Sequence, residues 1–370
     1  GLGTAKAQAG RLTYGTFDLL KLPTGGVERI PVLIARGKRP GPCFWITTGI
    51  HGPEHSGLQV IHDLVTPALA RELRGTVVAL PALSPAGLRT TQRVPYYAPG
   101  DPNRLFPDGK PPKEPDADRD PPGDFELGLA RLFQEIKRSA DYLVDIHNAW
   151  TGSLSFVYRD RVLYRAGRNA QPSKAAAEAL DRKLDGLCEA YGHSVVMEYG
   201  VKKYLDEKLQ RSTSGAALNL ASIPALTLEL GCGHMPDPAI RKACVAGLRN
   251  SLRHAGMLGG TREAIGGIKV ARPGFRCRQR RCVRVPAPCV VKHLAESGAR
   301  IQKGTPLLEL RDIWGRLLPM SPLRSEYEGW IMGRLHGIVY NAQQPAYVMA
   351  IRDDLPTVQP FPKDYFSKKG

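Results

Sequence analysis

The feature that most constrains the fold is an alternation of short apolar segments with longer segments of helical character. In the longer segments the apolar residues recur every three or four positions, as on one face of a helix. The strand-like segments are residues 41–49, 76–81, 141–147 and 223–230, and the helical ones are residues 54–64, 124–140, 173–191 and 238–258. Strands that alternate with helices form a mostly parallel sheet with helices on both faces. We therefore predict an α/β domain over residues 1–265, with a mixed, mostly parallel central sheet flanked by helices.

The sequence changes character near Gly266. Helical spacing disappears there, and short alternating segments separated by glycine and proline turns follow. This pattern predicts a small, barrel-like all-β domain over residues 270–360 and a tail at residues 361–370. An irregular region lies earlier in the chain: residues 95–122 contain nine prolines, and residues 108–126 are rich in acids. We expect a long loop there.

The charge balance and the composition exclude several classes of protein. The formal net charge is +17, from 52 Lys and Arg against 35 Asp and Glu. Such an excess suits a nucleic acid, an anionic substrate or a solvated basic surface. No apolar run reaches the roughly 18 residues of a membrane span, so no membrane partner is expected. The seven cysteines are spread too thinly for a disulfide framework, which favours a cytoplasmic location.

The most basic segment runs from Arg272 to Arg284 and contains six arginines. It lacks the aromatic residues and the motifs that accompany nucleic-acid binding, so no nucleic acid is predicted as a partner. We expect a solvated edge, away from the catalytic motifs, or a contact between subunits, which leaves a homo-oligomer open. Three cysteines precede His293 in the same region, but their spacing is wider than in structural zinc sites, and we expect buried free thiols.

The first cluster with chemical meaning is Gly49-Ile50-His51-Gly52-Pro53-Glu54. His51 and Glu54 are three residues apart, where a predicted strand ends and a helix begins. Open α/β sheets place their sites at this carboxyl edge. An imidazole nitrogen and a carboxylate oxygen are both usual zinc ligands. An H-x-x-E sequence on its own is common as a surface pair, so a metal site requires a third ligand.

His147 is the best candidate for the third ligand. It ends the predicted strand at residues 142–147 and would therefore lie at the same sheet edge as His51. Asp145 precedes it by two residues and points to the same side of the strand, so it could accept a hydrogen bond from a ligand imidazole. The alternative is that His147 is a half-buried histidine bonded to the backbone.

Glu229 is an acid inside an otherwise apolar strand. Such a burial costs free energy unless the acid is paired or functional. The flanking leucines would exclude water and raise its pKa toward the value that suits a general base. A buried partner in a salt bridge is the alternative. The loop before residue 110 adds cations: Arg93 could stabilise an oxyanion, and Arg104 beside Asn103 could hold a carboxylate, unless these side chains are merely solvated.

Four motifs follow one another along the chain. They are His51-Gly52-Pro53-Glu54, Asn103-Arg104-Leu105-Phe106-Pro107, Asp145-Ile146-His147 and Thr227-Leu228-Glu229-Leu230-Gly231. Together they resemble the succinylglutamate desuccinylase/aspartoacylase family, a branch of the zinc carboxypeptidase superfamily, over most of residues 41–260. The segment at residues 298–330 is similar to the lipoyl/biotinyl-like barrel of the bacterial members. The resemblance implies a zinc carboxypeptidase-like catalytic domain over residues 1–265.

The resemblance also implies roles for the matching residues. His51, Glu54 and His147 would bind one zinc ion per chain. Glu229 would take a proton from a zinc-polarised water and later return it to the leaving amine. Arg93 stands where the family keeps an arginine that polarises the scissile carbonyl group.

The implied substrate contacts come from two segments. Asn103 and Arg104 match the family's pair of ligands for the substrate carboxylate. After the metal histidine the family often has threonine, whereas this chain has Asn148 and then Ala149 and Trp150. We include Trp150 among the substrate-binding residues, and the departure leaves the identity of the substrate open.

The predicted function is the hydrolysis of an amide bond in a small, anionic N-acyl amino acid or N-acyl amine. A zinc carboxypeptidase that acts on short peptides is the runner-up, because Arg104 could bind a carboxylate on either side of the scissile bond. A basic binding module that retains the fold is the non-enzymatic alternative. The presence of three metal ligands together with Glu229 argues against that alternative.

Overall fold

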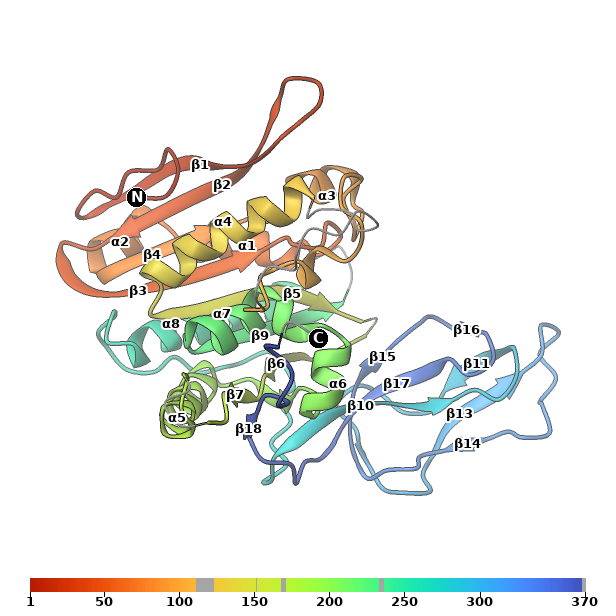
Figure 1. The fold of residues 1–370 in the computed structure, drawn as a ribbon. Coiled ribbons are helices and arrows are strands. Elements are labelled where there is room, and N and C mark those ends of the chain that lie inside the picture. Colours follow the sequence, from red (N-terminus) through yellow and green to blue (C-terminus); the bar gives the residue numbers. More distant parts are fainter. Residues whose placement is uncertain (111–122, 151, 168–170, 233–235, 368–370) are drawn as a thin grey trace.

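A mixed sheet of twelve strands forms the centre of the molecule (Figure 1). The computed structural model describes residues 1–110, 123–150, 152–167, 171–232 and 236–367, so most of the acidic, proline-rich loop lies outside the described residues. In spatial order the strands are β1 (Arg11–Lys21), β2 (Val27–Arg36), β4 (Arg74–Leu80), β3 (Arg39–Thr48), β5 (Tyr142–Ala149), β9 (Ala225–Cys232), β6 (Ser155–Arg159), β8 (Ser194–Met197), β10 (Cys277–Arg284), β17 (Pro345–Arg352), β15 (Gly329–Arg334) and β12 (Arg300–Ile301).

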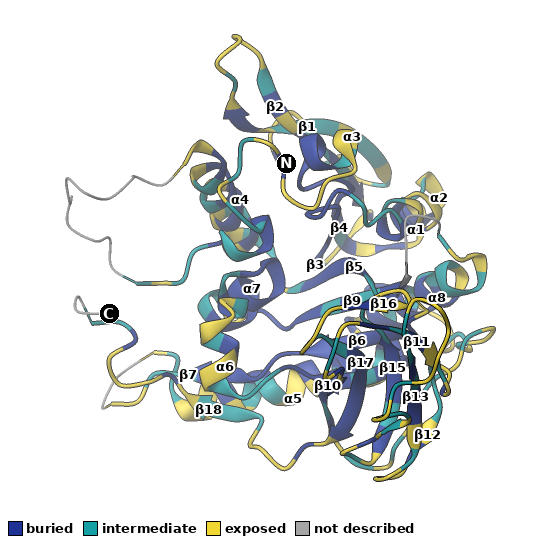
Figure 2. Ribbon diagram, turned by 90° about the vertical axis from the view of Figure 1, so that its right-hand side faces the viewer, coloured by how far each residue is buried: buried dark blue, intermediate teal, exposed yellow. Residues whose placement is uncertain are grey.

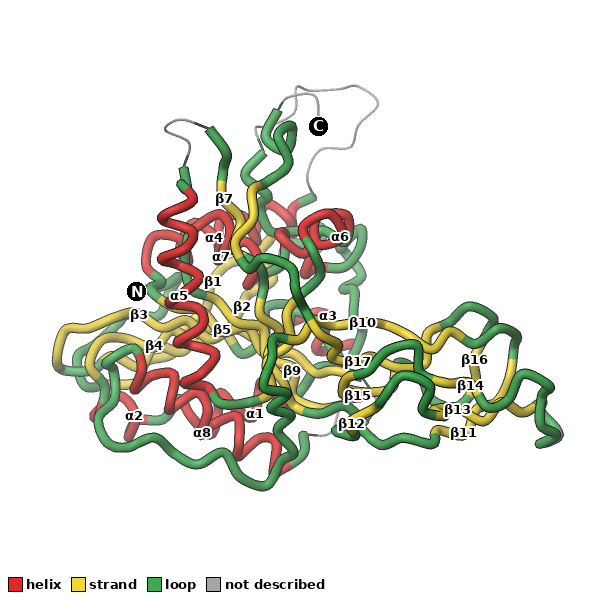
Figure 3. The backbone as a smooth tube through the Cα atoms, turned by 90° about the horizontal axis from the view of Figure 1, so that it is seen from below, coloured by secondary structure: helices red, strands yellow, loops and turns green. Residues whose placement is uncertain are grey.

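Helices cover both faces of this sheet. Figure 3 shows α4 and α7 on one side and α1 and α8 on the other. No helix among the described residues is long and apolar enough to cross a membrane. The helices are α1 (Ser56–Leu64), α2 (Pro67–Glu72), α3 (Pro85–Thr90), α4 (Asp124–Ser139), α5 (Lys174–Tyr191), α6 (Val201–Asp206), α7 (Thr213–Ala221) and α8 (Pro238–His254), with 3-10 turns η1 (Pro102–Arg104) and η2 (Leu209–Arg211).

The middle of the sheet is parallel and buried. Strands β4, β3, β5 and β9 pair in parallel, so their carboxyl ends lie at one edge. Because helices cover both faces, a central strand is apolar along most of its length, and β5 is buried from Leu143 to Asn148. This arrangement confirms the predicted class, a mixed sheet flanked by helices. Figure 2 shows the buried strands enclosed by more exposed helices and loops.

Several local features differ from the sequence-based expectation. The hairpin of β1 and β2 was not predicted, because only part of its length is buried and its apolar alternation is weak. Strands β6 and β8 were also missed, and β6 pairs antiparallel to β9, so the chain direction within the sheet changes there. Helix α4 begins at Asp124, as the range predicted for it does, with Gly123 at its N-cap position, and it ends at Ser139.

Residues 277–352 form an all-β region, here called the C-terminal β unit. Its strands β10, β17, β15 and β12 extend the large sheet, and β10 joins it where Arg278 pairs with Met197 of β8. A second sheet contains β14 (Leu323–Arg324), β13 (Pro306–Arg311), β11 (Cys289–His293) and β16 (Val339–Tyr340). The unit has its own apolar core and projects from the end of the large sheet (Figure 1). The limits at residues 265 and 270 stay a prediction, because one sheet runs across them.

The end of the chain returns to the α/β part. Strand β18 (Val358–Pro360) pairs with β7 (Val162–Tyr164), and Phe361 and Tyr365 are buried beyond it. The tail expected at residues 361–370 is therefore packed as far as residue 367, and residues 368–370 lie outside the described residues. The connection is reinforced by an ion pair that is fully buried: Nη2 of Arg161 lies 3.0 and 2.9 Å from the two carboxylate oxygens of Asp353.

Replacing Arg161 by Met should destabilise the protein, because Asp353 would keep only its weaker contacts with other arginines. Removal of one partner from a buried ion pair costs about 3 kcal/mol or more. We expect urea denaturation to show a loss of about 3 kcal/mol in the free energy of unfolding. As a matched control, Lys174→Met breaks the exposed pair of Lys174 and Glu178 (3.7 Å) and should cost less than about 1 kcal/mol. Equal losses in the two variants would contradict this prediction.

Candidate metal centre and active site

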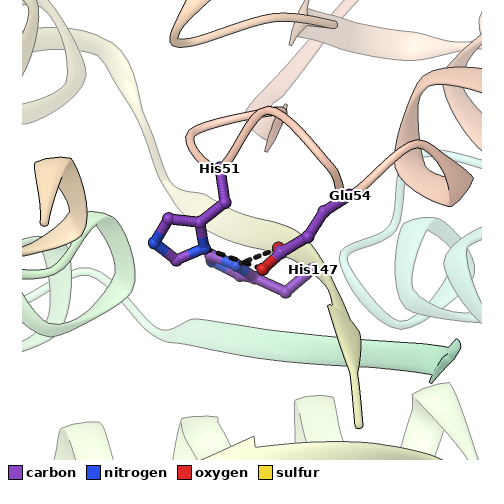
Figure 4. Close-up of side chains that lie close together, drawn as sticks. All are labelled: His51, Glu54 and His147. Carbon is purple, nitrogen blue, oxygen red and sulfur yellow. Dashed lines mark hydrogen bonds and ion pairs between the residues drawn. The ribbon is translucent and has the colours of Figure 1, made fainter. Parts of the chain in front are cut away.

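Two neighbouring parallel strands bring the three predicted metal ligands together. His51 and Glu54 lie in the turn between β3 and α1, and His147 lies near the carboxyl end of β5, which pairs with β3. One possible ligand atom from each residue lies within 4.8 Å of the others. Figure 4 shows both imidazole rings beside the carboxylate of Glu54. Within the part of the chain that the structure describes, this is the single group of histidine, cysteine and acidic side chains arranged to hold a metal ion.

Carboxylates and imidazoles alternate in this cluster. In its middle, Oε1 of Glu54 lies 2.9 Å from Nδ1 of His51, and Oε2 lies 2.7 Å from Nδ1 of His147. Nε2 of His51 lies 2.9 Å from Oδ1 of Asp101, and Nε2 of His147 lies 2.8 Å from Oδ2 of Asp145. An imidazole donates at both nitrogens only when both carry protons. We call these five residues the ligand row.

The charges of the ligand row control its protonation. Burial alone would lower the pKa of His147, but the charges of Asp145 and Glu54 outweigh burial and raise this pKa well above its ordinary value. Burial alone would raise the pKa of Glu54, and the charges of His51 and His147 outweigh it, so this pKa is lowered. Burial opposes the shift at Asp101 too, where the hydrogen bond and charge of His51 lower the pKa. The charges within the row thus favour the ionised forms of Glu54 and Asp101 and the protonated form of His147.

The donor set of the ligand row fits a divalent metal ion. Two imidazole nitrogens and one carboxylate oxygen form a usual ligand set of catalytic zinc sites, which keep a further position for water or substrate. Asp101 and Asp145 contact the ring nitrogens that face away from Glu54. Such outer carboxylates orient a ligand histidine and fix the tautomer that leaves its inner nitrogen available. A cation beside Glu54 would replace the protons that the two Nδ1 atoms share with it.

Asp101 is the member of the ligand row that sequence reasoning missed. Besides His51, it contacts Nη2 of Arg93 at 2.8 Å and accepts the backbone N–H of Asn103 at 2.9 Å. The sequence held one signal: Asp101 lies two residues before Asn103, and aspartate is a favoured N-cap residue. Its contact with His51 depends on the course of a long loop, which no local pattern specifies.

The three loop residues predicted to contact the substrate have different surroundings. Arg93 is half exposed, and its Nη1 lies 3.5 Å from Oε1 of Glu54. Asn103 is buried, its Oδ1 accepts from the backbone N–H of Thr213 at 2.9 Å, and its Nδ2 lies 3.3 Å from Nε2 of His147. Both ends of this amide are thus held by the protein. Arg104 donates from Nε to the backbone oxygen of Glu207 at 2.8 Å and lines the cavity described below.

Glu229 lies opposite His147 in the register of β5 and β9. Its side chain is directed to the same cavity as the ligand row, and its Oε2 is buried without a hydrogen-bond partner among the described residues. Burial is the largest cause that raises the pKa of Glu229, to about 8, although the charge of His147 opposes the shift. A carboxylate with a raised pKa and a free oxygen beside a possible metal site can exchange protons with a ligand in the cavity.

His51, Glu54 and His147 of the ligand row, together with Glu229, line one cavity of about 380 Å³. This volume lies within the range of small-molecule sites, about 300–1,000 Å³. Trp150 contributes to one wall and stacks on Phe156, with ring centroids 6.0 Å apart. Gln279 and Arg281 reach the cavity from β10 of the C-terminal β unit. The basic segment was expected to lie away from the catalytic motifs, and Arg281 corrects this expectation, because the pairing of β10 with β8 extends the sheet beneath the cavity.

The sequence of this chain matches a known family of proteins. The model of the succinylglutamate desuccinylase/aspartoacylase catalytic domain matches residues 40–255. An N-alpha-acetyl-L-2,4-diaminobutyric acid deacetylase of Halomonas elongata is 25% identical over 251 residues, which are 65% of this chain and 64% of that protein. The chain thus spans somewhat less than two thirds of the length of this relative.

Solved structures share the fold along almost the whole chain. The succinylglutamate desuccinylase/aspartoacylase of Rhodobacter sphaeroides has a TM-score of 0.68 at 20% identity, covering 93% of this chain and 96% of that one. The product-bound ectoine utilization protein EutE (DoeB) of Ruegeria pomeroyi has a TM-score of 0.70 at 19% identity, covering 92% and 95%. Because the family model matches more than half of the sequence, the chain belongs to the succinylglutamate desuccinylase/aspartoacylase family.

Proposed function

We propose that the protein is a zinc-dependent deacylase that hydrolyses the amide bond of a small N-acyl amino acid. The observation that carries this proposal is the buried, unpartnered Oε2 of Glu229, which lies in one cavity with the ligand row. Amide hydrolysis needs an activated water and a group that moves its proton. The relative from Halomonas elongata is named as a deacetylase of an N-acetylated amino acid, which supports the reaction class. The free thiols of the described cysteines suit a cytoplasmic location.

Each residue has a distinct task in this proposal. His51, Glu54 and His147 would hold the zinc ion, which supplies Lewis-acid polarisation of a carbonyl oxygen and acidifies a water molecule. Glu229 accepts the proton of the attacking water and delivers it to the nitrogen of the leaving amine. Arg93 is placed beside Glu54, where its guanidinium stabilises the negative charge that develops on the acyl oxygen.

The cavity also suggests which substrates bind. Arg104 and Arg281 both line it, and a guanidinium binds a carboxylate with two parallel hydrogen bonds. The carboxylate of an amino acid is therefore the anion that we assign to these cations. Trp150, which stacks on Phe156, gives the cavity an apolar wall that suits a short acyl chain or side chain.

Replacing Glu229 by Gln removes the proton acceptor but keeps the size and shape of the side chain. We expect the Glu229→Gln variant to bind one zinc ion per chain and to lose activity toward N-acyl amino acids by about 100- to 10,000-fold in kcat. Metal content is measured by elemental analysis and activity by release of the free amine. A variant that retains zinc and at least a tenth of the normal kcat would show that another group is the base.

Removal of the metal ion should abolish activity, and zinc should restore it. We expect a chelator-treated protein to regain activity at one equivalent of zinc, whereas His147→Ala should not. Asp101→Asn removes the charge that orients His51 and should weaken zinc affinity by about 10- to 100-fold. Asp18→Asn, which alters an exposed pair with Arg29 (2.9 Å), is the control and should leave the affinity unchanged. Full activity in the chelated protein would exclude a metal-dependent mechanism.

A further inference from the structure

Two acids line the cavity beyond Glu229 that the proposed reaction does not use. Asp160 directly follows β6, and Glu198 directly follows β8. The parallel register of these strands pairs Arg159 with Met197, so Asp160 and Glu198 are the next neighbours beyond that pair. Like charges placed side by side on neighbouring strands repel each other. The fold therefore holds two carboxylates together in one wall of the cavity.

Both carboxylates are buried, with 6% of each residue exposed. Their hydrogen bonds come from neutral groups: the hydroxyl of Tyr204 donates to Asp160 at 2.8 Å, and the backbone N–H of Tyr199 donates to Glu198 at 3.2 Å. The side-chain amide of Gln279 also donates to Glu198. Among the described residues, neither acid has an Arg, Lys or His nitrogen within ion-pair distance, although the chain carries an excess of cations. A buried charge without a countercharge is costly unless a ligand supplies one.

The neighbouring cations are engaged elsewhere. The charge of Arg104 reaches both acids, but Nε and Nη1 of Arg104 donate to the backbone oxygens of Glu207 and Asn103. Burial is the largest cause of a raised pKa at both acids: the pKa of Asp160 rises to about 6 and that of Glu198 to about 7. The charge of Asp160 raises the pKa of Glu198 further. Burial thus disfavours the charged form of both carboxylates, and only neutral donors hold them in place.

A second observation, independent of this pair, indicates that the same cavity receives a polar ligand. The unpartnered Oε2 of Glu229 is fully buried and directed into it. Asp160, Glu198 and Glu229 line this one cavity. A group bound by the two acids would therefore lie in the same cavity as the reacting amide and not at a distant surface.

We propose that Asp160 and Glu198 bind a free ammonium group of the substrate, so that the substrate is a diamino acid acylated on one of its two amines. This inference rests on the proposed deacylase function. Such a molecule offers three groups that the cavity can match: the amide to the ligand row and Glu229, the carboxylate to Arg104 and Arg281, and the ammonium group to the two acids. An ammonium group has three donors and can bond to both carboxylates at once. The relative from Halomonas elongata is named for a substrate of this kind, an acetylated 2,4-diaminobutyric acid.

The experiment compares two substrates that differ only in this charge. Nα-acetyl-L-2,4-diaminobutyrate carries the ammonium group, and Nα-acetyl-L-norvaline has a methyl group in its place. With the zinc-loaded protein we expect kcat/KM to be about 10- to 100-fold higher for the charged substrate. The isomer acetylated on the side-chain amine tests which amine carries the acyl group, and a preference for either isomer over the norvaline derivative supports the proposal.

Substitutions then assign the preference to the two acids. Asp160→Asn and Glu198→Gln keep the shape of each side chain and should each reduce the ratio of the two kcat/KM values at least fivefold. A structural effect would lower both values and leave their ratio unchanged. Glu28→Gln is the matched control, because Glu28 is also a buried glutamate (4% exposed) but pairs with Arg89 at 2.8 Å, outside the cavity. In this control, the ratio of kcat/KM for the diaminobutyrate substrate to kcat/KM for the norvaline substrate should equal that of the unmodified protein.

A binding measurement separates this inference from the proposed function. Calorimetry with L-2,4-diaminobutyrate and L-norvaline, on the protein with and without zinc, needs no catalysis. Tighter binding of the diamine, weakened by Glu198→Gln, supports the ammonium site even if no N-acyl amino acid is hydrolysed, in which case only the deacylase proposal fails. Equal binding of both compounds, or hydrolysis of both acetylated substrates at equal kcat/KM, overturns the ammonium site and leaves the two acids as a pair that shares a proton.

Discussion

The contact between Glu54 and two histidines is the interaction on which the rest of the site depends. Its carboxylate bridges the inner nitrogens of His51 and His147, and two further carboxylates hold the outer nitrogens. Three acids and two imidazoles are brought close together in a buried place, and such a group is stable only if positive charge lies within it. A divalent cation would supply that charge compactly, and His51, Glu54 and His147 are arranged so that they could hold one.

The geometry of the sheet explains how chemistry and recognition meet in one cavity. The parallel strands β3, β5 and β9 position His51, Glu54, His147 and Glu229. The reversed strand β6 then carries the sheet onward to β8 and β10. Side chains two residues apart on a strand share a face. Thr227 and Glu229 on β9, and Tyr158 and Asp160 on β6 and its end, line the same cavity in this way. The cavity thus crosses several strands instead of lying only at their ends.

The sequence predicts what local patterns encode. His51, Glu54 and His147 were found because each lies at the end of an apolar segment, and the ends of parallel strands meet at one sheet edge. Asp145 followed from its spacing to His147. Asp101 was missed because a long loop brings it to the ligand row. Asp160, Glu198 and Arg281 were missed because their positions depend on strand pairings between distant segments, β6 with β9 and β8 with β10, that no period in the sequence reveals.

The entry of β10 into the cavity wall has a consequence for how the proposed site is encoded along the chain. The residues that we propose to hold the cation and move the proton lie between His51 and Glu229, whereas Gln279 and Arg281 are encoded in a separate all-β segment. Gln279 orients Glu198 across the boundary between these two parts. Under the proposed function, side chains on β10 can therefore alter which molecules bind without any change in the proposed metal ligands or Glu229. The two parts of the chain meet at Gln279, whose amide donates to Glu198 and accepts from the hydroxyl of Tyr158.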